Sequence, residues 1–224
     1  MKRPFLCIFS ALCLLTAGGC SGVGKRYANI CSPDVKILRY HTLKYYEDIG
    51  IFTQRLYAKN PLYEPDQRVR KEKIKAILGQ KGGFSLGTKL SLSLSHELLT
   101  QAFSPSPPLK DRVLLLALGL KKGIDEAYST SGGPFLTGCQ IDISRLKRLY
   151  QNLLQVSWRL KTYKDSKGRP LFITNEATEN GYINMGFEVI LTRMLTRIQD
   201  DIYLRGGLEG NLTFRLGTIF LSIL

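Results

Sequence analysis

The sequence predicts a mainly α protein, a single compact helical domain of about five helices. Apolar residues recur every three or four positions along several long segments, which places them on one face of a helix. These segments begin at Ser, Asp or Pro and end at Gly or Pro, the residues that start and stop helices. Strand-like alternation is confined to short stretches. Residues 170–174 are the candidate for a short β segment, and the tail 208–224 fits either a strand or a helix turn.

The first two helices follow from their start and stop signals. Ser32-Pro33-Asp34 combines a cap, a first-turn proline and an acidic residue, so we expect a helix over 33–59 that ends before Asn60-Pro61. A second helix begins near Pro65-Asp66 and ends at Gly79. Its outer face is expected to carry the densest basic stretch of the chain, a candidate basic patch of Arg68, Arg70, Lys71, Lys73 and Lys75.

The middle of the chain holds an ambiguous segment and a buried helix. Within residues 84–103, Leu and Ser alternate before a helix-like stretch begins at His96, and we expect helix across most of the segment. Three prolines in residues 104–108 then break the chain. The helix expected over 110–128 is apolar nearly all round, which predicts that it is the central buried helix.

Two further helices complete the expected domain. A loop rich in Gly, Ser and Thr covers 129–138, and Asp142 then caps a helix that runs to about Tyr163. The last long helix is expected over 181–204, with an apolar inner face and Gly206-Gly207 after its end.

The N-terminus has the pattern of an export signal. Lys2 and Arg3 precede an apolar run of about eleven residues, which is too short to span a membrane, and small residues follow. The segment Ala17-Gly18-Gly19-Cys20 resembles the lipobox of bacterial lipoproteins. That resemblance implies that residues 1–19 are removed, that Cys20 carries acyl chains, and that 20–32 form the anchor and tether of a helical periplasmic domain over 33–224.

The resemblance also implies a location. In Gram-negative lipoproteins a serine after the anchor cysteine, here Ser21, directs the protein to the outer membrane. The pattern departs from the family at Ala17, where a larger aliphatic residue is usual. The alternative is a secreted or periplasmic protein cut by the ordinary signal peptidase, with Cys20 not lipidated.

The net charge of the chain limits the classes of partner to be expected. The chain has 32 basic and 18 acidic residues, and loss of residues 1–19 changes the net charge from +14 to +12. An exported basic domain meets anionic lipid headgroups and acidic wall polymers, so we expect no nucleic-acid partner. The alternative is that the charge chiefly maintains solubility.

Two cysteines remain after the anchor. Cys31 and Cys139 could form one disulfide in an oxidising compartment, or they could stay as separate buried thiols. Such a bridge would be structural and would carry no activity.

Catalytic signatures are weak throughout the chain. Its two histidines, His41 and His96, belong to no metal-binding motif, and we expect no cofactor, no metal and no catalytic residue. The polar loop before the last helix is the candidate ligand site, through Glu176, Glu179, Asn180, Tyr182 and Asn184. Paired carboxylates could act as acid and base on a glycan, whereas acidic residues before a helix are also ordinary caps.

Three functions fit these observations. The first is a non-enzymatic interaction or assembly component of a bacterial envelope system, with envelope proteins as partners. The second is a cell-wall or glycan-active enzyme that uses Glu176 and Glu179. The third is a basic binding module for anionic lipid or wall polymer.

Overall fold

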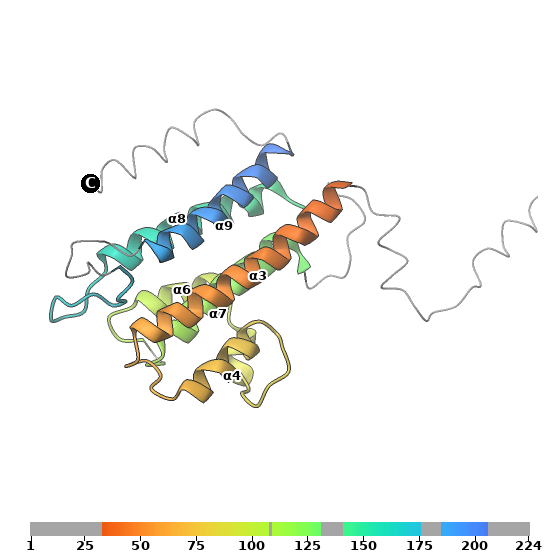
Figure 1. Ribbon diagram of the computed structural model, residues 1–224. Helices are drawn as coiled ribbons and strands as arrows, with labels where there is room; N and C mark the ends of the chain where they lie inside the picture. Colours follow the sequence, from red (N-terminus) through yellow and green to blue (C-terminus); the bar gives the residue numbers. More distant parts are fainter. Residues whose placement is uncertain (1–32, 108, 131–140, 176–184, 206–224) are drawn as a thin grey trace, which may run out of the picture.

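The computed structural model describes residues 33–107, 109–130, 141–175 and 185–205, and these form a mainly helical domain (Figure 1). This confirms the predicted fold class. The described residues form seven helices: α3 (Pro33–Lys59), α4 (Gln67–Ile77), α5 (Gly87–Leu92), α6 (Ser95–Phe103), α7 (Arg112–Tyr128), α8 (Ile143–Thr162) and α9 (Gly186–Tyr203). The sequence therefore predicts fewer helices, about five, than the described residues form.

Helix α7 is the centre of the domain, as the sequence predicted. Every residue from 111 to 120 is buried, and α7 contacts α3, α4, α6 and α8. Helix α3 packs against α7 and also contacts α9, while α8 and α9 lie side by side (Figure 1). A helix that is apolar all round needs neighbours on every side, and these contacts supply them.

The segment 84–103 forms two helices rather than one. Gly87 adopts φ +69°, a conformation that favours glycine, and α5 then runs only to Leu92. Ser93 and Leu94 are extended, and the Glu97 carboxylate accepts the Leu94 N–H, which starts α6. The Leu–Ser alternation thus marks neither a strand nor a continuous helix.

The candidate β segment at 170–174 is not a strand. The described residues contain only an isolated antiparallel bridge between Lys164 and Pro170. Ile173 pairs instead with the Asn60 amide, which accepts from its N–H at 2.7 Å and donates to its carbonyl at 2.9 Å. Leu171 and Phe172 are buried against the helices, so side-chain burial rather than a sheet holds this segment.

Aspartates begin three of the helices. Asp66, Asp111 and Asp142 each accept a backbone N–H at the start of α4, α7 and α8, which confirms the expected starts near residues 66 and 142. Helix α9 begins at Gly186, and the residues before 185 that were expected to begin it lie outside the described ranges. The tail 208–224 lies outside them as well.

Candidate functional site

Many of the predicted site residues lie outside the described ranges. These are Cys20, Cys31, Cys139, Glu176, Glu179, Asn180, Tyr182 and Asn184. Lipidation, the disulfide and the acidic loop therefore remain predictions.

The predicted basic patch lies on α4, where its members differ in exposure. Arg68, Lys71 and Lys75 are exposed. Arg70 is half-buried, and its guanidinium donates to the carbonyls of Glu64 and Pro65. The chain before α4 thus fixes Arg70. Arg68 and Lys71 keep their charges in solvent, while Lys75 donates to the Glu72 carboxylate at 2.7 Å.

Lys73 corrects the prediction, because it does not lie on the outer face. Only 7% of it is exposed, and its ammonium donates to Glu64 at 2.5 Å and to Asp111 at 2.7 Å. Lys73 is four residues from both Val69 and Ile77, which places it on their inward side of α4. The spacing contained this signal, but the run of basic residues obscured it.

A groove of about 370 Å³ runs beside these cations, between α3 and α4. Tyr57 and Ala58 of α3 and Ile74 of α4 give it an apolar floor, and Arg70, Lys71 and Lys75 form its basic side. A partner segment with an apolar face and acidic residues would complement both features.

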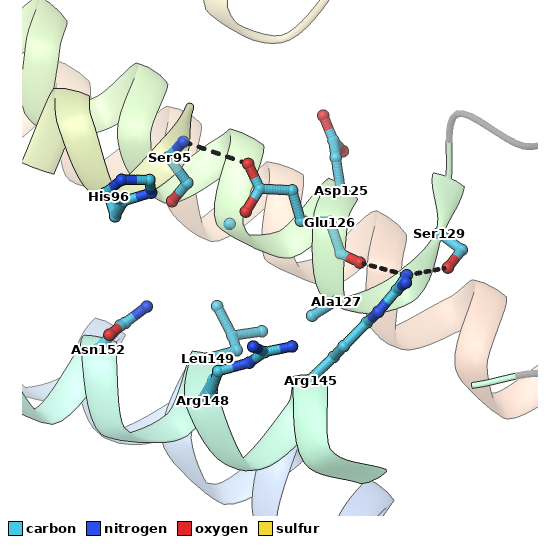
Figure 2. Close-up of a pocket in the computed structure, with 11 residues that line it drawn as sticks. Ser95, His96, Asp125, Glu126, Ala127, Ser129, Arg145, Arg148, Leu149 and Asn152 are labelled. Carbon is cyan, nitrogen blue, oxygen red and sulfur yellow. Dashed lines mark hydrogen bonds between the residues drawn. The ribbon is translucent and has the colours of Figure 1, made fainter. Parts of the chain in front are cut away.

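A larger cleft of about 800 Å³ lies where the N-terminus of α6 and the end of α7 face α8. Figure 2 shows Arg148 and Asn152 on α8, opposite His96 and Glu126. Arg145 reaches across at the other end of the cleft, where its Nη1 lies 3.3 Å from the Ser129 hydroxyl. Most of the side chains that line this cleft are polar.

The two acidic residues of the cleft have structural partners. Asp125 points away from α8 (Figure 2) and accepts from Tyr46, Lys121 and Thr130. Burial, together with the bond to Asp125, raises the pKa of the Tyr46 hydroxyl to about 12. Glu126 Oε1 accepts the Ser95 N–H at 3.1 Å and so satisfies a donor in the first turn of α6.

Helix α8 contributes a polar stripe to this side of the molecule. Its members are Arg145, Arg148, Asn152, Gln155 and Arg159, spaced by three and four residues, and all of them line the cleft or a smaller hollow of about 70 Å³ next to it. Sequence analysis missed this stripe because only the apolar face of 142–163 was considered. The same helical spacing applied to the polar face would have found it.

The two histidines have different surroundings. His41 is half-buried, and its Nδ1 lies 3.0 Å from Asp201 Oδ1. His96 is exposed and lines both hollows beside α8. Among the described residues, no group of three or more His, Cys, Asp or Glu side chains could hold a metal ion.

Neither the search for membrane-spanning helices nor comparison with known proteins assigns this chain to a class. Over the ranges that the structure describes, no helix combines the length and the apolar character needed to cross a membrane. No protein-family model, no curated protein and no solved structure matches this chain.

Proposed function

We propose that this protein is a lipid-anchored bacterial envelope lipoprotein that acts as a non-enzymatic interaction or assembly component. Cys20 carries the lipid, residues 20–32 are the tether, and the helical domain faces the periplasm from the outer membrane. The observation that carries the interaction role is the groove between α3 and α4, where exposed cations border an apolar floor.

The chemistry of the groove supports a protein partner over a simple polymer. Ala58 and Ile74 supply apolar contact area, while Lys71 supplies charge. Protein interfaces combine an apolar centre with a polar rim in this way. An acidic wall polymer would need the charges without the apolar floor.

Tethering explains how a shallow groove could serve such a role. An anchored domain meets membrane partners at a high effective concentration, so a weak individual contact is enough. The net charge of the chain, +14 before any processing, also attracts acidic partners at ordinary ionic strength.

The test is co-purification from detergent-solubilised envelopes with the tagged full chain. Native protein is compared with Arg68→Glu/Lys71→Glu on α4 and with Lys164→Glu/Lys167→Glu, which makes the same change in net charge away from α4. We expect defined envelope proteins to co-purify with the native chain and the control, and to be depleted several-fold in the α4 variant.

Two outcomes would contradict the proposal. Equal losses in both variants would reduce the contact to general charge attraction. Recovery of wall fragments or lipid alone, without proteins, would instead favour the binding module for anionic polymers or the enzyme that uses Glu176 and Glu179.

A further inference from the structure

The polar stripe of α8 forms one wall of a continuous hollow along α6. The cleft of about 800 Å³ and its smaller neighbour share His96 and Asn152, so the second extends the first along the helices. The larger volume is within the range of ligand sites, which is roughly 300–1,000 Å³. The floor contains Leu149 in the cleft and Leu99 and Val156 in the extension, and all three are buried.

The cations of the stripe have unused hydrogen-bonding capacity. Arg148 is exposed and has no hydrogen bond or ion pair to any described residue. Arg145 makes only long contacts, at 3.3 Å to Ser129, 3.5 Å to the Glu126 carbonyl and 3.9 Å to the Asp142 carboxylate. A guanidinium with free donors is suited to bind a carboxylate or a phosphate in a bidentate manner.

Arg159 gives a second, independent observation at the far end. Its Nε is buried and has no hydrogen-bond partner within the described part of the chain. The guanidinium lies over the rings of Phe103 and Tyr163, at 5.7 and 5.4 Å from their centroids. These rings fix its position and leave its other nitrogens available to a ligand.

The spacing along α8 sets the length of the ligand. Arg145 and Arg159 are fourteen residues apart, which in an α-helix is on the order of 20 Å. An extended peptide of about six residues spans the same distance. Between the arginines, Asn152 and Gln155 each offer an amide donor and acceptor, which is the chemistry that pairs with a peptide backbone.

We propose that the hollow between α6 and α8 binds a short extended peptide that carries carboxylates at both ends. Arg145 and Arg148 bind one carboxylate, Arg159 binds the other, and Asn152 and Gln155 bind the backbone between them. Glu126 Oε2, which accepts no hydrogen bond from a described residue, faces a backbone N–H of the ligand. Glu126 also opposes highly charged anions, which favours carboxylates over phosphates.

This inference goes beyond the proposed function, because it concerns another face of the molecule and different cations. The α4 groove and the α8 hollow share no lining residue. Either can fail without the other.

The test measures binding of a labelled hexapeptide, with glutamate at each end and alanine between, to the full chain in detergent. The ionic strength is about 0.15 M, so that weak surface attraction is screened. A peptide with glutamine at each end is the matched ligand control, and both peptides have blocked termini so that the glutamate side chains supply the only carboxylates. We expect the glutamate peptide to bind at least tenfold more tightly than the glutamine peptide.

Variants of the protein locate the site. We expect Arg148→Gln to weaken binding roughly tenfold, as loss of a charge-assisted pair does. Arg68→Gln on α4 removes one exposed arginine elsewhere and should leave the affinity unchanged. Asn152→Ala should weaken binding of the peptide without affecting folding, because Asn152 is exposed.

Four results would overturn the proposal. They are equal binding of the two peptides, equal losses in Arg148→Gln and Arg68→Gln, displacement of the peptide by inorganic phosphate at the same concentration, and no binding at millimolar peptide. Phosphate displacement would identify a general anion site in place of a peptide groove.

Discussion

At the residue scale, the most consequential side chain is Lys73, a buried cation between two carboxylates. Burial alone lowers the pKa of its ammonium, but the bonds to Asp111 and Glu64 outweigh this and raise the pKa above its ordinary value of 10.5. Asp111 also accepts from the Tyr57 hydroxyl at 2.9 Å and caps α7. One cluster thus joins α3, α4 and α7.

Replacing Lys73 tests this cluster. Lys73→Met leaves Asp111 as an unpaired buried carboxylate, so we expect the free energy of unfolding to fall by about 3 kcal/mol. Adding Asp111→Asn, which keeps a capping side chain, should recover part of the loss. Urea unfolding measures both variants, and strictly additive losses would show that the two residues are not coupled.

The same cluster predicts a dependence on pH. The hydrogen bond from Lys73 lowers the pKa of the Glu64 carboxyl from its ordinary 4.5. This contribution to stability is complete above that ordinary value and is lost as the pH falls through the lowered one. In Lys73→Met the contribution is absent, so its stability should decline less between pH 7 and about pH 3. A decline equal to that of the native chain would contradict this explanation.

Two buried tyrosines give a matched pair of substitutions. The Tyr128 hydroxyl lies 2.6 Å from Asp201, which is fully buried, and 2.9 Å from the Tyr45 hydroxyl. Burial raises the pKa values of the Tyr45 and Tyr128 hydroxyls well above the ordinary 10. The hydroxyl of Tyr150 is also buried but has no hydrogen-bond partner among the described residues.

We therefore expect different effects from removing the hydroxyls of Tyr128 and Tyr150. Tyr128→Phe should lower the free energy of unfolding by about 1–3 kcal/mol, because it leaves Asp201 under-satisfied. Tyr150→Phe should be neutral or slightly stabilising, because no bond is lost. Thermal unfolding of the two variants decides the matter, and equal destabilisation would assign the effect to ring contacts.

At the scale of elements, α6 packs closely on the backbone of α7. A Cβ added at Gly119 would lie 2.9 Å from the Leu99 side chain and 3.2 Å from its backbone nitrogen. Ser95 donates its hydroxyl to the Gly119 carbonyl at 2.8 Å. Gly119 and Gly123, one helical turn apart, therefore allow α6 to pack on the backbone of α7.

Alanine at two helical glycines tests this contact. Gly119→Ala should lower the free energy of unfolding by about 1–3 kcal/mol, because α6 must shift. Gly50→Ala in α3 adds a Cβ whose nearest neighbour is the end of the Leu78 side chain, at an ordinary contact distance of 3.4 Å. The higher helix propensity of alanine should therefore stabilise the fold by about 0.5–1 kcal/mol. Denaturant unfolding should give changes of opposite sign, and a loss at both sites would contradict the distinction.

At the scale of the whole molecule, the proposed lipid on Cys20 would attach the domain to a membrane. Under the proposed lipidation, Cys20→Ala should move the protein from the membrane fraction to the soluble periplasmic or secreted fraction, because a single point of anchoring is lost. Cys31→Ala, eleven residues later, is the matched control and should stay with the membrane. Fractionation followed by immunoblotting measures both, and an unchanged Cys20→Ala distribution would favour ordinary secretion.

Part of the candidate site could be predicted from local spacing, and part depends on contacts between distant segments. The spacing of Arg68, Lys71 and Lys75 placed them on an exposed face of α4. The predicted exposure of Lys73 is wrong because a lysine can be buried when two carboxylates pair with it, and Glu64 and Asp111 do so. The stripe from Arg145 to Arg159 became a candidate site only when α6 and α7 were seen opposite it.

The sequence by itself determined the helical class, the boundaries of α3, α7 and α8 to within a few residues, and the central position of α7. These depend on local signals, namely caps, breakers and helical spacing, which act within a few residues. Only the tertiary structure decided that α5 and α6 are separate, that Lys73 is buried, and that α8 forms a hollow with α6. Spacing can suggest which helix face a residue occupies, and local bonds begin α6, but the partners come from distant segments. Asp111 pairs with Lys73, and α6 faces α8. Lys122 binds the carbonyls of Ser91 and Ser93 where α5 ends, so each contact joins residues far apart in the chain.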